Sequence, residues 1–127
     1  MLQVPRRLRC GLAGGRMKLT ERIVGDAVVV DVEGRSSVSR GSGMVNVVEG
    51  LLKRKVLAIV LNLRVRGFDS SCMGEALVCH LKAKRRGAAL CVVSDDIKIW
   101  DVIKAMQLDR VLDCHRTEEG ALAALRN

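Results

Sequence analysis

The run VLAIVLNL (residues 56–63) decides the fold class of this sequence, because it is apolar at almost every position. A strand with one face in solvent alternates apolar and polar residues, whereas an uninterrupted apolar run of this length is typical of a strand covered on both faces. The segment FDSSCMG (68–74) follows shortly after it and leads into a helical pattern. The sequence therefore predicts a central strand that ends in a polar turn.

Strand and helix patterns alternate on both sides of this run. KLTERIV (18–24) and AVVVDVEG (27–34), joined by the turn residues GD, predict an opening antiparallel hairpin. The other expected strands are 88–94 and 110–114, and the expected helices are 44–55, 73–86, 95–106 and 117–127. This order predicts an α/β fold, a mixed β-sheet that opens with the hairpin and continues by β-α alternation, with about four helices.

The segment FDSSCMG is the first candidate site. Residues 69–71 precede a predicted helix and are candidates for its N-terminal cap, next to backbone N–H groups that have no partner within the helix. The helix itself is expected to pack through Met73, Leu77 and Leu81, which recur at helical spacing. Loops at the carboxyl ends of strands carry function in such sheets, so we expect the site there.

Composition and charge argue against a nucleic-acid partner. The sequence is 49% hydrophobic but has only one Phe, one Trp and no Tyr, so it lacks the aromatic side chains on which bases stack. The net charge of +8 falls to +4 without residues 1–16. The cluster LKAKRRG (81–87) lies near a predicted helix C-terminus, where cations are favoured. A basic nucleic-acid-binding module remains the less favoured alternative.

Residues 1–16 are expected to be a flexible basic N-terminal extension, and residues 17–127 the folded domain. The extension has four Arg and no acid, and MKLTERIVGD, which starts at Met17, reads like a natural chain start. The extension lacks the apolar core of a secretory signal, and no apolar run in the chain approaches the length that spans a membrane. We therefore expect no membrane association.

No pattern in the sequence indicates catalysis, a cofactor or a metal. Five cysteines without a CxxC pair indicate reduced thiols and a cytoplasmic location. The CH doublets at 79–80 and 114–115 suggest Cys and His ligands, but adjacent residues point in different directions, and a Cys–His nucleophilic pair lacks an accompanying oxyanion motif. GRSSVSRGSG (34–43) has neither of the glycine-rich phosphate-binding patterns, so it is expected to be a Ser/Gly loop.

Taken with VLAIVLNL, the segments FDSSCMGEAL, RRGAAL and VIKAMQLDRVLDCHRTEEGALAAL resemble the STAS domain of bacterial anti-sigma-factor antagonists over residues 17–126. The resemblance implies a protein-interaction switch that regulates transcription. Unphosphorylated, such a protein binds an anti-sigma factor that is a serine kinase. Phosphorylation by that kinase inactivates it, and a phosphatase of the PP2C-like type resets it.

The resemblance assigns the switch to particular residues. Asp69 matches the family's acid, Ser70 its phosphorylated serine, Ser71 the neighbouring serine and Gly74 the last glycine of the motif. Cys72 stands where the family usually has glycine. A Cβ at this position is costly if the backbone needs a positive φ or a partner must approach closely, and it is tolerated in an ordinary helical turn.

Further expectations follow from the same resemblance. The loop after the second strand is expected near the partner surface, and its candidate contacts are Arg35, Ser36 and Ser37. The chain is expected to be a monomer or a weak homodimer. A STAS domain that serves as a scaffold or sensor without a working switch is the main alternative function.

Overall fold

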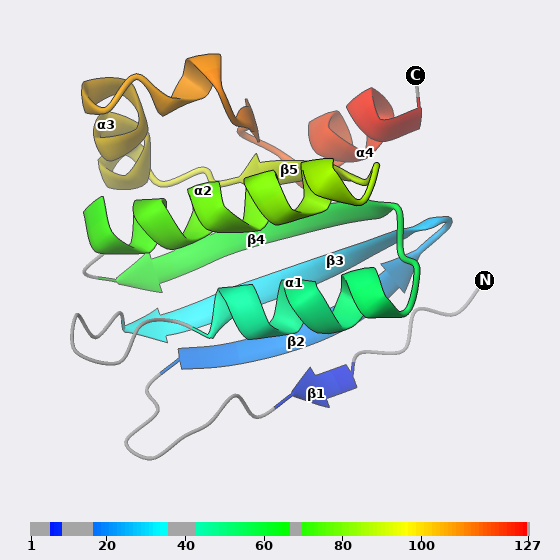
Figure 1. Cartoon of the computed structure of the whole chain (residues 1–127). Coiled ribbons are helices and arrows are strands. Elements are labelled where there is room, and N and C mark those ends of the chain that lie inside the picture. The colour runs from blue at the N-terminus through cyan, green and yellow to red at the C-terminus, as the bar shows by residue number, and fades with distance from the viewer. Residues whose placement is uncertain (1–5, 9–16, 36–42, 67–69, 127) are drawn as a thin grey trace.

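The chain forms one mixed β-sheet with helices on both faces (Figure 1). The computed structural model describes residues 6–8, 17–35, 43–66 and 70–126. The strands are β1 (Arg6–Leu8), β2 (Met17–Val24), β3 (Ala27–Arg35), β4 (Ala58–Arg66), β5 (Ala89–Val93) and β6 (Asp113–His115). The helices are α1 (Met44–Lys53), α2 (Ser70–Arg85), α3 (Ile97–Ala105), the 3-10 turn η1 (Leu108–Arg110) and α4 (Glu118–Arg126).

The strands lie side by side in their sequence order, β1 to β6. β2 pairs with both β1 and β3 in antiparallel fashion, and β3, β4, β5 and β6 are parallel to one another. The β2–β3 turn uses Gly25 with φ of 61°, a conformation that glycine adopts without steric cost. The predicted hairpin, the following β-α alternation and the mixed sheet are therefore confirmed.

The two faces of the sheet are covered unequally. Helices α1, α2 and α3 pack on one face and enclose most of the core, which includes Val30, Leu61 and Val92 from the three central strands. On the other face, α4 packs through Ala121 on a smaller cluster that includes Val60. In the described chain, no helix combines the length and the apolar composition that crossing a membrane requires.

Two strands differ from the bounds predicted from the sequence. β4 was expected at 56–63 but runs from Ala58 to Arg66, because its parallel pairing with β3 continues beyond the apolar run. Arg64 is exposed and Val65 is buried, so this extension alternates as a strand with one covered face does. The last strand was expected at 110–114 but occupies Asp113–His115, after the turn η1.

Helix α2 packs on the sheet mainly through small residues rather than through its leucines. The buried residues are Cys72, Met73, Ala76, Cys79 and Ala83, most of which are small. Small side chains let a helix approach the sheet closely, so the larger Leu81 turns outward and is 48% exposed. Of the predicted core positions on this helix, that of Met73 is fully buried and Leu77 is partly buried against the core, whereas Leu81 is not.

Part of the N-terminal segment belongs to the sheet. Residues 1–16 were expected to lie outside the fold, but Arg6–Leu8 form β1 and pair with residues 19–21 of β2. The expectation is wrong for these three residues. A strand this short is held by backbone hydrogen bonds and leaves no apolar periodicity in the sequence. Residues 1–5 and 9–16 lie outside the described part of the chain.

A charged network ties α4 to the hairpin. Arg22 of β2 donates to both carboxylate oxygens of Asp31 on β3, at 2.6 and 3.0 Å, and also binds the carboxylate of Glu118 at the start of α4. The side-chain amide of Asn62 donates to Asp31 at 3.1 Å. Hydrogen bonds to Asp31 and then to Glu118 hold the pKa of Arg22 above its ordinary value.

We expect Arg22→Met to lower the free energy of unfolding by about 1–3 kcal/mol, because it leaves the carboxylate of Asp31 largely buried without its cation. Denaturant unfolding followed by circular dichroism measures this change. Lys18→Met, at an exposed position of the same strand, is the matched control and should change stability by less than about 0.5 kcal/mol. Equal losses in the two variants would contradict a specific role for the network.

Candidate functional site

The candidate site lies where β4, the strand predicted to be central, is followed by α2. β4 has β3 on one side and β5 on the other, both parallel to it, and α2 begins at Ser70 after its carboxyl end. Ser70 and Ser71 thus form the start of the first turn of the helix. Asp69 lies outside the described residues. The structure accordingly places the serine pair at the edge of the sheet where the sequence predicted a site.

The next two residues fix this turn to the core. Cys72 is 1% exposed and the side chain of Met73 is fully buried. Cys72 is helical and is absent from the described non-glycine residues with positive φ, so its backbone makes no demand for glycine. The residue is therefore an ordinary part of a helical turn, and its side chain is buried in the interior.

A partly apolar surface continues along α2 from the serines. A Cβ on Gly74 would meet no atom within 4 Å, so the helix surface is open there. Val78 and Leu81 follow at i+4 and i+7 from Gly74, on the same side of the helix, and are 40% and 48% exposed. Val78 was not among the predicted site residues, and Leu81 was predicted to lie in the core. In the sequence of α2, small residues alternate with larger apolar ones, and this pattern could have indicated that the small residues face the core and the larger ones face solvent.

The second group of candidate contacts begins at the same edge of the sheet. Arg35 is the last residue of β3 and stands in register with Arg66, the last residue of β4. The structure therefore brings the start of the Ser/Gly loop next to the chain that leads into α2. Ser36 and Ser37 lie outside the described residues.

The charges along α2 follow the polarity of a helix. Its first turn contains no acidic residue, and its last turn carries Lys82, Lys84 and Arg85. Lys82 also forms an ion pair of 3.1 Å with Glu49 of α1. The basic cluster in LKAKRRG thus lies at the negative end of the helix dipole and is partly paired. The positive, amino-terminal end is the end that carries the serines.

The thiols of the described residues have the character of buried structural groups. Burial, as the main cause, raises the pKa of Cys79 and of Cys91 to about 12, and that of Cys114 to about 11. A nucleophilic thiol needs the opposite shift. These three thiols are therefore not activated as nucleophiles.

Solved structures provide the comparison. An anti-sigma factor antagonist from Mycobacterium paratuberculosis is similar over 91% of this chain and 98% of its own, with a TM-score of 0.79 and 18% identity. A putative anti-sigma factor antagonist from Thermotoga maritima matches 84% of this chain and 93% of its own, with a TM-score of 0.73 and 21% identity. No protein-family model matches the sequence, and no curated protein does.

Proposed function

Because the chain has the STAS fold of the anti-sigma-factor antagonists, we propose that it binds an anti-sigma factor and so regulates transcription. It acts in the cytoplasm as a monomer or weak homodimer, and it works by binding rather than by catalysis. Its first partner is an anti-sigma factor with serine kinase activity. Its second is a phosphatase of the PP2C-like type, which restores the binding form.

Ser70 is the control point of this proposal. The observation that carries it is the position of Ser70 at the amino-terminal end of α2, one helical turn before the open surface at Gly74. A phosphate adds about −1.5 to −2 charges, which the positive end of a helix tolerates. Inside a protein contact the same charge would lose its hydration and would be repelled by Asp69. Both effects lower the affinity for the partner. Phosphorylation is thus compatible with the fold and incompatible with the interface.

The interface extends from the serines along one side of α2. Asp69, Ser70 and Ser71 form its polar end together with the loop that starts at Arg35. The exposed side chains of Val78 and Leu81 supply apolar area farther along the helix. The burial of Cys72 supports this proposal, because its side chain does not stand on the surface that a partner would approach.

Phosphorylation at Ser70 is tested by exposing the chain to native cytoplasmic extract with ATP and locating phosphate by mass spectrometry. We expect phosphate on Ser70, and we expect Ser70→Ala to capture the same kinase while remaining unmodified. Ser71→Ala is the matched control and should still be phosphorylated. Phosphate on Ser71 alone would overturn the assignment. Kinase capture without phosphate on either serine would favour a scaffold or sensor that does not switch.

A further inference from the structure

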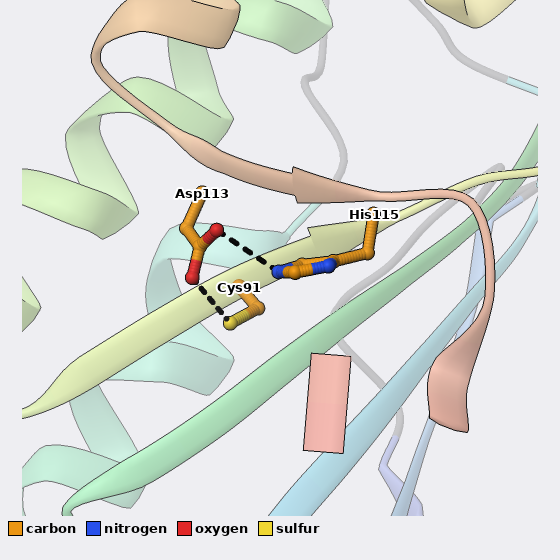
Figure 2. Close-up of side chains that lie close together, drawn as sticks. All are labelled: Cys91, Asp113 and His115. Atoms are coloured by element: carbon orange, nitrogen blue, oxygen red, sulfur yellow. Dashed lines mark hydrogen bonds and ion pairs between the residues drawn. The ribbon is translucent and has the colours of Figure 1, made fainter. Parts of the chain in front are cut away.

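A cluster of three metal-ligand residue types lies on the side of the sheet covered by α4, away from the core beneath α2. Cys91 is on β5, and Asp113 and His115 are on β6 (Figure 2). The parallel register places Cys91 directly beside Asp113, and His115 follows two residues later. Because side chains alternate along a strand, residues two apart share a face. The register therefore brings all three side chains together.

The three side chains converge on one point. The Sγ of Cys91 donates to Oδ2 of Asp113 at 3.2 Å, and Nε2 of His115 lies 2.9 Å from Oδ1 of the same carboxylate. One ligand atom from each residue can be chosen so that all three lie within 4.8 Å of one another. Figure 2 shows the thiol, carboxylate and imidazole turned toward each other across the two strands.

The imidazole of His115 is incompletely satisfied. Its Nε2 is buried and makes no hydrogen bond among the described residues, although Oδ1 of Asp113 lies 2.9 Å away as a possible ion-pair partner. A buried polar atom without a partner is costly and calls for an explanation. A cation bound between the three groups would provide the missing interaction.

We propose that Cys91, Asp113 and His115 bind a Zn²⁺ ion through one sulfur, one oxygen and one nitrogen atom. Thiolate, imidazole and carboxylate are the ligands that zinc uses in proteins. On binding, the thiol proton passes to solvent and the sulfur takes its place on the metal as thiolate. Three protein ligands leave the fourth tetrahedral position for water or for a group from another molecule.

The spacing of the ligands is close to that of a tetrahedral site. Zn–S bonds of about 2.3 Å and Zn–N or Zn–O bonds of about 2.0–2.2 Å separate neighbouring ligand atoms by about 3.5 Å. The contacts of 3.2 Å to Cys91 and 2.9 Å to His115 are made by the two different oxygens of Asp113, and both are shorter than this spacing, by about 0.3 and 0.6 Å. Binding through one oxygen of Asp113 therefore requires side-chain rotations that move the ligand atoms apart by these amounts.

The cluster does not have the arrangement of a catalytic triad. Asp113 stands between the thiol and the imidazole, so His115 is not placed to take the proton of Cys91. Burial and the hydrogen bond to Asp113 raise the pKa of the Cys91 thiol to about 12, the opposite of what a nucleophile needs. A metal reverses this balance, because its positive charge stabilises the thiolate.

The segment around α4 would be tied to the metal. The carbonyl of Ala121 in α4 lies 4.0 Å from the sulfur of Cys91. Gly120 of α4 lies beside the ring, since a Cβ built there would be in ordinary contact with Nδ1 of His115, at 3.7 Å. Zinc would therefore join β5 and β6 beneath α4, and zinc binding should raise thermal stability.

Isothermal titration calorimetry of the full chain with zinc chloride tests the proposal. The chain carries Cys10→Ser, so that the thiol of Cys10, which lies outside the described residues, cannot bind zinc. We expect one zinc per chain at micromolar concentration and a rise in the melting temperature. Asp113→Asn, His115→Gln and Cys91→Ala should each weaken binding at least about tenfold. Asp113 is 55% exposed and tolerates replacement, so the test does not depend on the buried cysteine.

Cys114→Ala is the matched control. It removes a thiol next to two of the ligands, but this side chain packs against the core on the opposite face of the sheet. Zinc affinity should be unchanged in this variant. With Co²⁺ as the probe, the thiolate-to-cobalt absorption band should disappear in Cys91→Ala and persist in Cys114→Ala. No zinc binding at micromolar concentration, or equal losses in Cys91→Ala and Cys114→Ala, would overturn the proposal and leave a hydrogen-bonded cluster.

Discussion

Ser70→Asp is expected to weaken binding of the proposed kinase partner by about 100-fold or more, which corresponds to about 2.7 kcal/mol. The added carboxylate sits at the start of α2, where the helix dipole favours an anion, so the melting temperature should stay nearly constant. In the complex the same charge loses its water and meets the acidic Asp69, and both effects oppose association. Titration calorimetry against the captured kinase and a thermal melt measure the two quantities.

The matched control adds the same charge elsewhere. Gln107 is exposed and lies between α3 and the last strand, outside both β4 and α2. Its φ of 55° is a conformation that aspartate adopts more readily than most residues, so Gln107→Asp should fold normally. It should bind the kinase like the unaltered chain. Equal loss of affinity in both variants would mean that net charge, rather than the site at Ser70, controls binding.

Leu61→Ala is expected to lower the free energy of unfolding by about 2–5 kcal/mol. Leu61 is fully buried in β4 and stands in register between Val30 of β3 and Val92 of β5. Its removal leaves a cavity at the middle of the larger core, where the flanking strands cannot close in without losing their pairing. Since domains of this size are stable by only about 5–15 kcal/mol, the loss is a large fraction of the total.

Leu57→Ala makes the same chemical change just before the same strand, at a side chain that is 60% exposed. It should cost less than about 0.5 kcal/mol. Urea denaturation of the two variants gives the comparison. A cost for Leu61→Ala as small as that for Leu57→Ala would show that the core closes around the missing side chain and would contradict the rigid central strand.

Local patterns were sufficient to predict the order of most elements. The alternation at 18–24 and the apolar run at 56–63 each report the burial of their own residues, which is why the hairpin and the central strand were recognised. The end of β4 was not predictable, because it depends on how far β3 runs alongside. β1 was missed for the same reason, since a three-residue strand exists only through its partner.

The features of the candidate site that depend only on neighbouring residues in the sequence were predictable. The serines precede a helix, and the structure places them at its start. Whether Cys72 was compatible with this turn depended on its backbone conformation, which the sequence does not reveal. The cluster of Cys91, Asp113 and His115 was out of reach, because it depends on the register of two strands that are separated by α3. Neither CH doublet indicated it, since the thiol and the imidazole come from different strands.

The strand β1 has a consequence for anyone who shortens the chain. Met17 looks like a natural start, yet a protein that begins there lacks the three residues that pair with Leu19, Thr20 and Glu21. The outward N–H and C=O groups of β2 would then face solvent along the whole strand, and an uncovered edge of this kind recruits strands from other molecules. A shortened chain is therefore more prone to self-association, and its apparent oligomeric state would reflect the cut rather than the protein.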